Sequence, residues 1–524
     1  MEPSLGTCRG FPHSAVSTID PLASQAALTV LRRGGSAVDA AIAANAVLSV
    51  VAMDTCGLGG DLVGLVYQPR TPRSGPKVHA LMGVGRAGSH ADAESLRAAG
   101  FRLIPRDHPA AITVPGAVDA WLLAHERFGR LPLETVLTDA IAYANDGFPA
   151  PARLARGAEE LWRLGYRSEL VLAFQENFQP GTVVRHRGIG RTLAALVRLG
   201  REGFYAGEFG AELVALSQGA LRADDLATPQ AELASPVGVE AMNLGFLTAP
   251  PPSAGFLALA LLRALPWRRP HSALEAYLDL VDAVEATRWL RAYHYDGVDV
   301  ADLLGSPRRP VAGRPRPRAE APDTTAIVVV DRNHGACVFV QSNAHSFGTR
   351  LATPDTGIFV HSRGAVGFDL DPRSPNELKP RRRPRHTLAP VMALDRATGQ
   401  LRIAAGTMGG DRQPTILAQV IAAALRNGLE VREALARARL AEVRVIPGEH
   451  PGFDTHVGGA ATTWAIERHA DEAVRQELNE RLGGIIVEPP LDPAAGVAHL
   501  AMLDSDAIVA CSDPRAEDGS AIGW

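Results

Sequence analysis

The chain has 524 residues, of which 46% are hydrophobic and 21% are charged, and its formal net charge is −4. This composition is that of an ordinary folded protein with a large core, and the weakly acidic charge gives no sign of a nucleic-acid partner or an anionic membrane surface. The four cysteines lie far apart and form no CxxC pair, so we expect neither a zinc site nor a disulfide framework, and we expect a reducing compartment.

The beginning of the chain carries no pattern typical of export. Residues 1–15 lack the basic and apolar regions of a secretory signal. The most apolar stretch, 37–53, is interrupted by Asp39 and Asn45 and is short for a membrane span. We therefore expect a cytoplasmic protein in which this stretch is a buried helix.

Two helices are predicted close to the N-terminus. Apolar residues recur at helical spacing over 21–33, and Gly34-Gly35 suits a helix end because glycine accepts a positive φ. Ser36 and Asp39 then have the spacing of a capping box. The second helix, over about 37–51, is apolar on all sides, which is typical of a helix inside a core.

The segment 306–323 differs sharply from the rest of the chain. It contains five prolines and five arginines, and it follows a region, 114–265, in which helical patterns alternate with Gly and Pro breaks. Such a segment lacks the apolar groups to fold alone. We expect it to be an extended or mobile strap on the surface.

A β-hairpin is predicted directly after this strap. Two β-branched runs, 324–331 and 336–343, flank the turn Arg332-Asn333-His334-Gly335. Both runs are apolar on both faces, so the hairpin belongs to a sheet that is covered on both sides. Helices outside such a sheet give either a four-layer αββα core or a three-layer αβα core.

Thr324, at the start of the first run, has a distinctive chemical setting. If the Asp323–Thr324 bond is cut, Thr324 gains a free α-amino group that can activate its own hydroxyl as general base. Such an amine titrates near pH ~8, so an appreciable fraction is neutral in a cell. Threonine is also common in strands, and this segment alone favours that plainer interpretation. The chain has no G-x-S-x-G, H-E-x-x-H or phosphate-loop motif.

Short motifs along the whole chain favour the catalytic interpretation. They are Gly34–Ala41, Gly57–Gly60, Val114–Ala117, Pro250–Gly255, Asp323–Thr325, Ser346–Thr349, Arg383–Pro390, Thr407–Asp411 and Ser512–Arg515 with Gly523. In this order they resemble the gamma-glutamyltransferase family of N-terminal-nucleophile hydrolases. The resemblance implies a four-layer αββα fold and self-cleavage into a large-subunit region, 1–323, and a small-subunit region, 324–524, which stay together in one composite fold. It implies no metal and no cofactor.

The resemblance also implies catalytic roles for particular residues. Thr324 matches the nucleophile, and Thr325 matches the threonine beside it. Ser342, with Asn343 next to it, best fits the second hydroxyl residue on the return strand. Gly409-Gly410 matches the pair whose backbone N–H groups form the oxyanion hole, where preorganised donors are typically worth ~3 kcal/mol each.

Substrate-binding residues follow in the same way, with two departures from the family. Arg86 matches the arginine that holds the substrate α-carboxylate, a task that suits a guanidinium fork. The family's Ser-Ser pair reads His386-Thr387 here, and no acidic pair occurs in the matching stretch 361–368. Because an α-ammonium without a carboxylate partner binds poorly, the chain resembles the branch of acylase-like and oxamate amidohydrolase-like proteins.

These matches predict a self-processing amidohydrolase or acyltransferase that cleaves a carboxylate-bearing acyl amide through a threonyl ester. Its partner is a small-molecule amide, and its two fragments stay associated without nucleic acid or membrane. Two alternatives stay open. One is a true glutathione hydrolase whose acidic ligand lies elsewhere, with Asp369 and Asp411 as the first candidates. The other is a non-catalytic binding or structural protein that is never cleaved.

Overall fold

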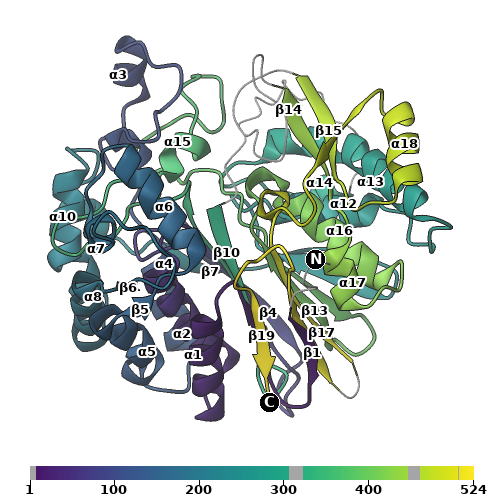
Figure 1. The fold of residues 1–524 in the computed structure, drawn as a ribbon, viewed down its shortest axis with the longest axis horizontal. Helices are drawn as coiled ribbons and strands as arrows, with labels where there is room; N and C mark the ends of the chain where they lie inside the picture. Colours follow the sequence, from purple (N-terminus) through teal and green to yellow (C-terminus); the bar gives the residue numbers. More distant parts are fainter. Residues whose placement is uncertain (1–6, 306–322, 446–460, 505–506) are drawn as a thin grey trace.

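The computed structural model describes residues 7–305, 323–445, 461–504 and 507–524. The predicted strap over 306–322 lies outside the described residues. Two seven-stranded antiparallel sheets form the centre of the molecule (Figure 1). Each sheet contains strands from both sides of residue 323, so the regions before and after this position share both sheets.

The first sheet, called the β10 sheet, contains the predicted hairpin. Its strands in spatial order are β19 (Ser520–Gly523), β2 (Ala15–Thr18), β10 (Asp323–Val330), β11 (Ala336–Ala344), β3 (Asp61–Gln68), β4 (Lys77–Gly83) and β7 (Ala231–Ala234). The second sheet is called the β13 sheet. Its strands are β1 (Cys8–Phe11), β18 (Ile508–Ser512), β17 (Ala498–Leu503), β13 (Leu401–Thr407), β12 (Val391–Asp395), β9 (Leu244–Thr248) and β8 (Val237–Ala241).

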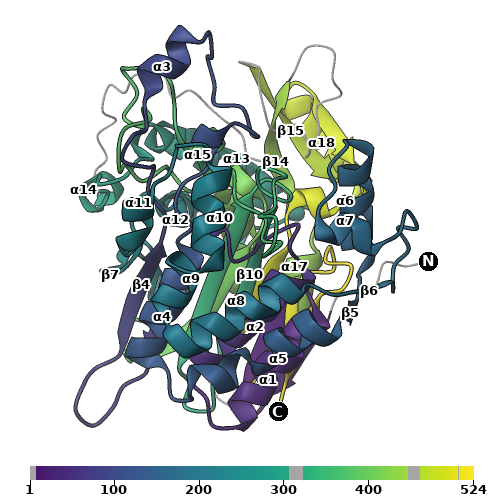
Figure 2. The ribbon, with the colours of Figure 1, turned by 90° about the vertical axis from the view of Figure 1, so that its left-hand side faces the viewer.

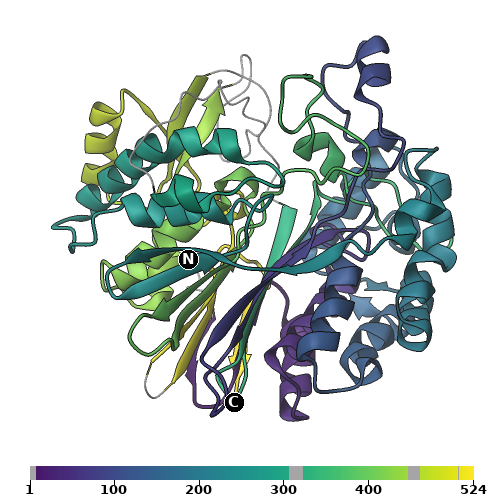
Figure 3. The same cartoon turned by 180° about the vertical axis from the view of Figure 1, so that it is seen from behind.

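Helices cover the outer face of each sheet, which makes the fold a four-layer αββα sandwich. The β10 sheet is covered by α1 (Pro21–Arg32), α2 (Ala37–Val51), α4 (Ala117–Phe128), α5 (Leu133–Asp146) and α8 (Arg187–Leu199), onto which Figure 2 looks. The β13 sheet is covered by α12 (Gly255–Ala264), α13 (Ala273–Thr287), α16 (Gln413–Leu425) and α17 (Val431–Ala436), seen from behind in Figure 3. The four-layer expectation is confirmed, and the three-layer alternative is wrong.

The other elements lie around this sandwich. The strands are β5 (Phe148–Pro149), β6 (Val183–Val184), β14 (Leu440–Val445), β15 (Ala461–Glu467) and β16 (Ile485–Glu488). The helices are α3 (Ala93–Ala98), α6 (Ala152–Arg163), α7 (Glu169–Ala173), α9 (Arg201–Tyr205), α10 (Glu208–Leu216), α11 (Ala223–Ala227), α14 (Ala301–Gly305), α15 (Arg363–Gly367) and α18 (Glu472–Arg481), with 3₁₀ turns at Pro109–Ala111, Arg288–Tyr293, Gly410–Arg412 and Pro493–Ala495.

The two predicted N-terminal helices are α1 and α2. Between them Gly34 has φ 90°, a conformation that glycine adopts without strain. The capping box is present, because Ser36 Oγ accepts from Asp39 N and Asp39 Oδ2 accepts from Ser36 N. Every residue of α2 is buried. Within the described ranges no helix combines the length and hydropathy that a membrane crossing needs.

The β10–β11 hairpin is also confirmed, and both of its faces are buried. Ile327 and Val329 point into the core beneath α2, whereas Val328 points into the core between the two sheets. At the turn, the buried Asp331 carboxylate accepts hydrogen bonds from Asn333 N and Gly335 N and from the first residue of α2. This carboxylate therefore ties the closed end of the hairpin to the helix above it.

The expectation of unpaired cysteines is wrong for two of the four. Cys8 on β1 and Cys511 on β18 are direct cross-strand partners and form a disulfide, with their Cα atoms 4.1 Å apart. Cys56 and Cys337 are free and buried. The paired cysteines are 503 residues apart in the sequence, so their spacing carried no sign of the bond.

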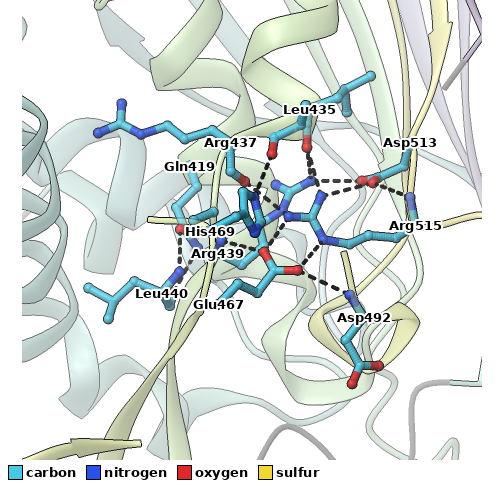
Figure 4. Close-up of polar contacts among 12 residues, drawn as sticks. Gln419, Leu435, Arg437, Arg439, Leu440, Glu467, His469, Asp492, Asp513 and Arg515 are labelled. Carbon is cyan, nitrogen blue, oxygen red and sulfur yellow. Dashed lines mark hydrogen bonds and ion pairs between the residues drawn. The ribbon is translucent and has the colours of Figure 1, made fainter. Parts of the chain in front are cut away.

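A cluster of four buried charged side chains lies between β15, α17 and the C-terminal strands (Figure 4). Arg515 Nη1 lies 2.9 Å from Asp513 Oδ1, and Arg515 Nε donates to Glu467 Oε1 at 3.0 Å. Arg439 Nη2 donates to the other oxygen of Asp513 at 2.7 Å. Burial alone would raise the pKa of Asp513, but the two guanidinium groups outweigh burial and hold it below its usual range. All four charges are therefore satisfied inside the protein.

We predict that this cluster is sensitive to the loss of one charge. Glu467→Gln leaves Arg515 with one carboxylate instead of two and should lower the free energy of unfolding by about 3–5 kcal/mol. The control is Glu477→Gln, which removes the exposed ion pair with Arg481 on α18 and should change stability little. Urea unfolding of both variants is the measurement, and equal midpoints would contradict the prediction.

Candidate active site

The predicted nucleophile, Thr324, lies at a β-bulge. Asp323 pairs with Ala344 and Thr325 pairs with Gln341, so the register shifts at Thr324. Thr324 is 1% exposed. Bulges redirect side chains and are frequent beside active sites. Burial raises the pKa of the Asp323 carboxyl to about 6, although Arg106 opposes the shift.

Of the residues predicted to support Thr324, Ser342 contacts the peptide bond before it. Ser342 Oγ donates a hydrogen bond of 2.7 Å to the carbonyl oxygen of Asp323 and accepts one of 2.9 Å from Ala344 N. Thr325 Oγ1 is buried and has no hydrogen-bond partner among the described residues. The peptide bond between Asp323 and Thr324 therefore has a hydroxyl donor on its carbonyl oxygen.

Asn343 faces the loop that follows α2. Its Nδ2 donates to Met53 O at 3.1 Å, and its backbone N donates to Thr55 O at 3.2 Å. A side chain at Gly60 would meet Ser342 O at 2.7 Å and Asn343 Oδ1 at 2.8 Å. The glycine motif 57–60 thus permits the close approach of this loop to β11.

The glycine pair predicted as oxyanion hole lies just after β13. Gly409 has φ 133° and Gly410 has φ 53°, and a Cβ on Gly409 would meet Ile416 Cδ1 at 2.5 Å. Three residues earlier, Gly406 is in tight contact with Ala326, because a Cβ there would lie 2.9 Å from Ala326 Cβ. This contact places the end of β13 beside the beginning of β10.

The buried charge cluster supports this glycine turn from behind. Glu467 Oε1 accepts from Asp492 N, and Asp513 Oδ2 accepts from Ala498 N, so both ends of the segment 492–498 are held by the cluster (Figure 4). Met408 N donates to Val497 O at 2.9 Å within that segment. Met408, the residue before the glycine pair, is thus hydrogen-bonded to a segment whose two ends are held by buried carboxylates.

Arg86 lies at the end of the turn that follows β4. Its backbone N donates to Gln230 Oε1 at 3.0 Å, and its side chain is half-buried. Burial lowers the pKa of Arg86, the neighbouring Arg383 lowers it further, and Glu232 and Asp296 oppose the shift. The contact of Arg86 with a substrate carboxylate stays a prediction.

His386 and Thr387 are both buried. His386 Nδ1 accepts from Leu388 N at 3.5 Å, and His386 Nε2 lies 3.4 Å from Asp61 Oδ2. Burial lowers the pKa of His386 to about 3, so the ring is neutral at physiological pH. The ring is directed at a carboxylate of the protein itself, and its predicted contact with substrate stays untested.

Asp61 is the residue that sequence reasoning missed. It is fully buried at the first position of β3, directly after the glycine motif 57–60. A carboxylate in a run that is otherwise apolar needs partners, because burying an unsatisfied charge is costly. This cost could have marked Asp61 as a residue with a role when only the sequence was known. Its partners could not have been named, because they lie far along the chain.

The two candidate acids for an α-ammonium are both engaged by side chains of the protein. Asp369 Oδ2 accepts from Ser374 Oγ at 2.5 Å. Asp411 Oδ1 lies 3.5 Å from Arg385 Nη1. Each of these carboxylates therefore already has a partner within the protein.

Comparisons with known proteins agree with this geometry. The Gamma-glutamyltranspeptidase family model matches residues 23–523. The chain is 30% identical to the glutathione hydrolase-like YwrD proenzyme of Bacillus subtilis (strain 168), with 96% of this chain and 97% of that protein covered. It is 34% identical to the oxamate amidohydrolase proenzyme of Klebsiella pneumoniae, with 80% and 83% covered.

A solved structure extends the similarity to the whole fold. The crystal structure of cephalosporin acylase from Bacillus halodurans superposes with a TM-score of 0.84 at 26% identity, covering 100% of this chain and 98% of that one. The family match spans nearly the full length and includes the bulge at Thr324, the glycine turn and Arg86. The chain belongs to the gamma-glutamyltranspeptidase family.

Proposed function

We propose that this protein is a self-processing amidohydrolase that cuts its own Asp323–Thr324 bond and then uses Thr324 to cleave amides of a carboxylate-bearing acyl group. The observation that carries the proposal is the hydrogen bond from Ser342 Oγ to the Asp323 carbonyl oxygen. A donor at this oxygen stabilises the negative charge that develops when the carbonyl carbon is attacked.

Self-cleavage begins with attack by the hydroxyl of Thr324. Its oxygen bonds to the Asp323 carbonyl carbon, the carbonyl oxygen gains charge beside Ser342, and the C–N bond then breaks. The proton of the hydroxyl passes to the departing nitrogen, which becomes the α-amine of Thr324. Water hydrolyses the resulting ester, leaves a new carboxylate on Asp323, and restores the hydroxyl of Thr324.

Substrate turnover uses the same hydroxyl with its new amine as general base. The oxygen of Thr324 attacks the amide carbonyl, and the N–H groups of Gly409-Gly410 stabilise the oxyanion. The proton goes to the leaving amine, and an acyl-threonyl ester remains. Water completes hydrolysis, or a second amine accepts the acyl group.

Two features favour an acyl group with a carboxylate and no α-ammonium. Arg86 supplies a cation suited to a carboxylate fork. The stretch 361–368 contains no acid, and Asp369 and Asp411 are engaged by Ser374 and Arg385. The relatives named for oxamate and cephalosporin are consistent with this preference, and glutathione hydrolase activity is the second candidate.

The two fragments remain associated through the shared sheets, and the expected location is the cytoplasm. β10 lies between β2 and β11 and pairs with both. Separation of the fragments would therefore expose strand edges and the core between the sheets. This favours one composite fold after cleavage, with residues 1–323 and 324–524 as its two parts.

Self-cleavage predicts two fragments of the purified protein on a reducing, denaturing gel. The smaller should begin Thr-Thr-Ala-Ile by mass analysis. Thr324→Ala should leave one chain of 55.4 kDa, whereas Thr324→Ser keeps a hydroxyl and should still be cut. Ser342→Ala should slow the cut by about 10²–10³-fold, since it removes the donor to the carbonyl oxygen. A wild-type protein that stays a single chain would refute the proposed function.

Substrate preference separates the two candidate activities. Glutaryl anilide and gamma-glutamyl anilide differ only by the α-amino group, and an unpaired ammonium should cost at least ~1–3 kcal/mol, or roughly tenfold to a hundredfold in kcat/KM. Glutaryl anilide should be at least as good a substrate. Arg86→Ala should raise the KM of both and leave self-cleavage intact. A tenfold preference for gamma-glutamyl anilide would favour the glutathione hydrolase instead.

The cytoplasmic location is tested by the state of Cys8 and Cys511. Disulfides are rare in the cytosol, where thiols are kept reduced. Cells lysed into denaturant with an alkylating reagent should therefore give protein with all four cysteines modified. A product with two modified cysteines, or recovery of the protein outside the cell membrane, contradicts the location.

A further inference from the structure

Asp61 has one carboxylate oxygen committed to backbone groups of two other segments. Its Oδ1 accepts hydrogen bonds of 3.0 Å from Gly85 N and 3.0 Å from Gly116 N. A Cβ on Gly85 would lie 1.5 Å from a backbone oxygen, so this position tolerates no side chain. In the β3–β11 register Asp61 stands opposite Ser342. The carboxylate thus lies one strand away from the bulge at Thr324.

The other oxygen of Asp61 faces two histidine rings. Oδ2 lies 3.4 Å from His386 Nε2 and 3.6 Å from His361 Nδ1. All three side chains are fully buried. Among the residues that the structure describes, no group of His, Cys, Asp and Glu side chains has the arrangement to hold a metal ion.

The surroundings of the rings decide where their protons lie. Leu388 N donates to His386 Nδ1, so the neutral ring carries its proton on Nε2, directed at Asp61. His361 Nε2 lies 3.0 Å from the carbonyl oxygen of Thr113, which can only accept, so the neutral His361 ring carries its proton on Nε2 and donates to Thr113. For His386 the other tautomer would turn a lone pair towards the carboxylate, which the negative charge opposes.

One oxygen of this carboxylate therefore accepts two backbone N–H groups, and the other faces the Nε2–H of His386 at 3.4 Å. Burial lowers the pKa of both histidines. Burial alone would raise the pKa of Asp61, but His361, His386 and the Gly85 N–H hold it below its usual range. The carboxylate is thus a buried anion among neutral groups, and its backbone donors and the His386 ring come from three different segments of the chain.

Two of these segments carry residues that were predicted to bind substrate. Gly85 precedes Arg86, and His386 precedes Thr387. The segment that begins at His361 lies against β11, because Ser362 N donates to Asn343 O at 3.1 Å. We propose that Asp61 is a positioning residue that holds Arg86 and Thr387 in one substrate-binding arrangement. This rests on the proposed function, because it assigns Asp61 to the substrate side of that site.

The chain offers a matched control in Asp331. It is a buried carboxylate in the same sheet that accepts backbone N–H groups at the closed end of the β10–β11 hairpin. Within the described part of the chain its side chain contacts Ala37, Asn333, Gly335 and Arg130, none of which lies in a segment with a predicted substrate-binding residue. Asp331→Asn therefore serves as a control. It measures how much stability is lost when a buried carboxylate that accepts backbone N–H groups is neutralised, without a change at the substrate-binding residues.

The test compares substrate binding in variants that still cut themselves. Asp61→Asn should raise the KM for glutaryl anilide by on the order of tenfold to a hundredfold, with a smaller change in kcat, because misplaced binding groups weaken productive geometry. Asp331→Asn should leave KM at the wild-type value. His386→Leu removes a donor to Asp61 and should raise KM, whereas His386→Gln keeps an N–H donor and should lose less.

A second measurement needs neither turnover nor a folded Asp61 variant. Selective ¹⁵N labelling of histidine in the wild-type protein should show a protonated Nε2 on His386 across the neutral pH range. An unprotonated His386 Nε2, or equal KM values in Asp61→Asn and Asp331→Asn, would overturn the proposal. A wild type with this proton in place but no self-cleavage would refute the proposed function alone.

Discussion

Burial of the β10–β11 hairpin on both faces is the constraint on which the site depends. The two strands are apolar on both sides, so one face must lie against α2 and the other against the β13 sheet. Thr324 begins this hairpin and is therefore held between two rigid layers. Gly406 on β13 and Gly60 in the loop after α2 both lie close against the hairpin, because a Cβ at either position would meet Ala326 or Ser342.

Buried carboxylates hold the loops on two sides of this hairpin: Asp61 on one side, and Asp513 with Glu467 on the other. Asp61 accepts backbone N–H groups and faces the His386 ring on the side of Arg86. Asp513 and Glu467 accept the backbone N–H groups at the two ends of segment 492–498, on the side of the glycine turn. A buried charge contributes little net stability compared with an apolar core. Its hydrogen bonds, however, are directional, so each carboxylate fixes loops that apolar packing alone would leave free to shift.

The parts of the fold that could be predicted are those with local patterns. The hairpin, the capping box of Ser36 and the all-apolar α2 follow from residues within a few positions of one another. The Cys8–Cys511 disulfide and the contact of Asp61 with His386 join residues hundreds of positions apart, and no local pattern specifies them. For the site, the resemblance to the family indicated the candidate catalytic and substrate-binding residues. The direction of the His386 ring could not be predicted, because it depends on how segments far apart in the sequence pack together.

The disulfide has a consequence for the processed protein. Cys8 belongs to the region before residue 323 and Cys511 to the region after it, so the bond would join the two products of self-cleavage covalently. Two separate chains refold by a second-order encounter that slows on dilution, whereas linked chains meet at a fixed effective concentration. In an oxidising medium the cut protein would keep the concentration-independent refolding of a single chain, and reductant would convert it into a heterodimer whose recovery depends on dilution.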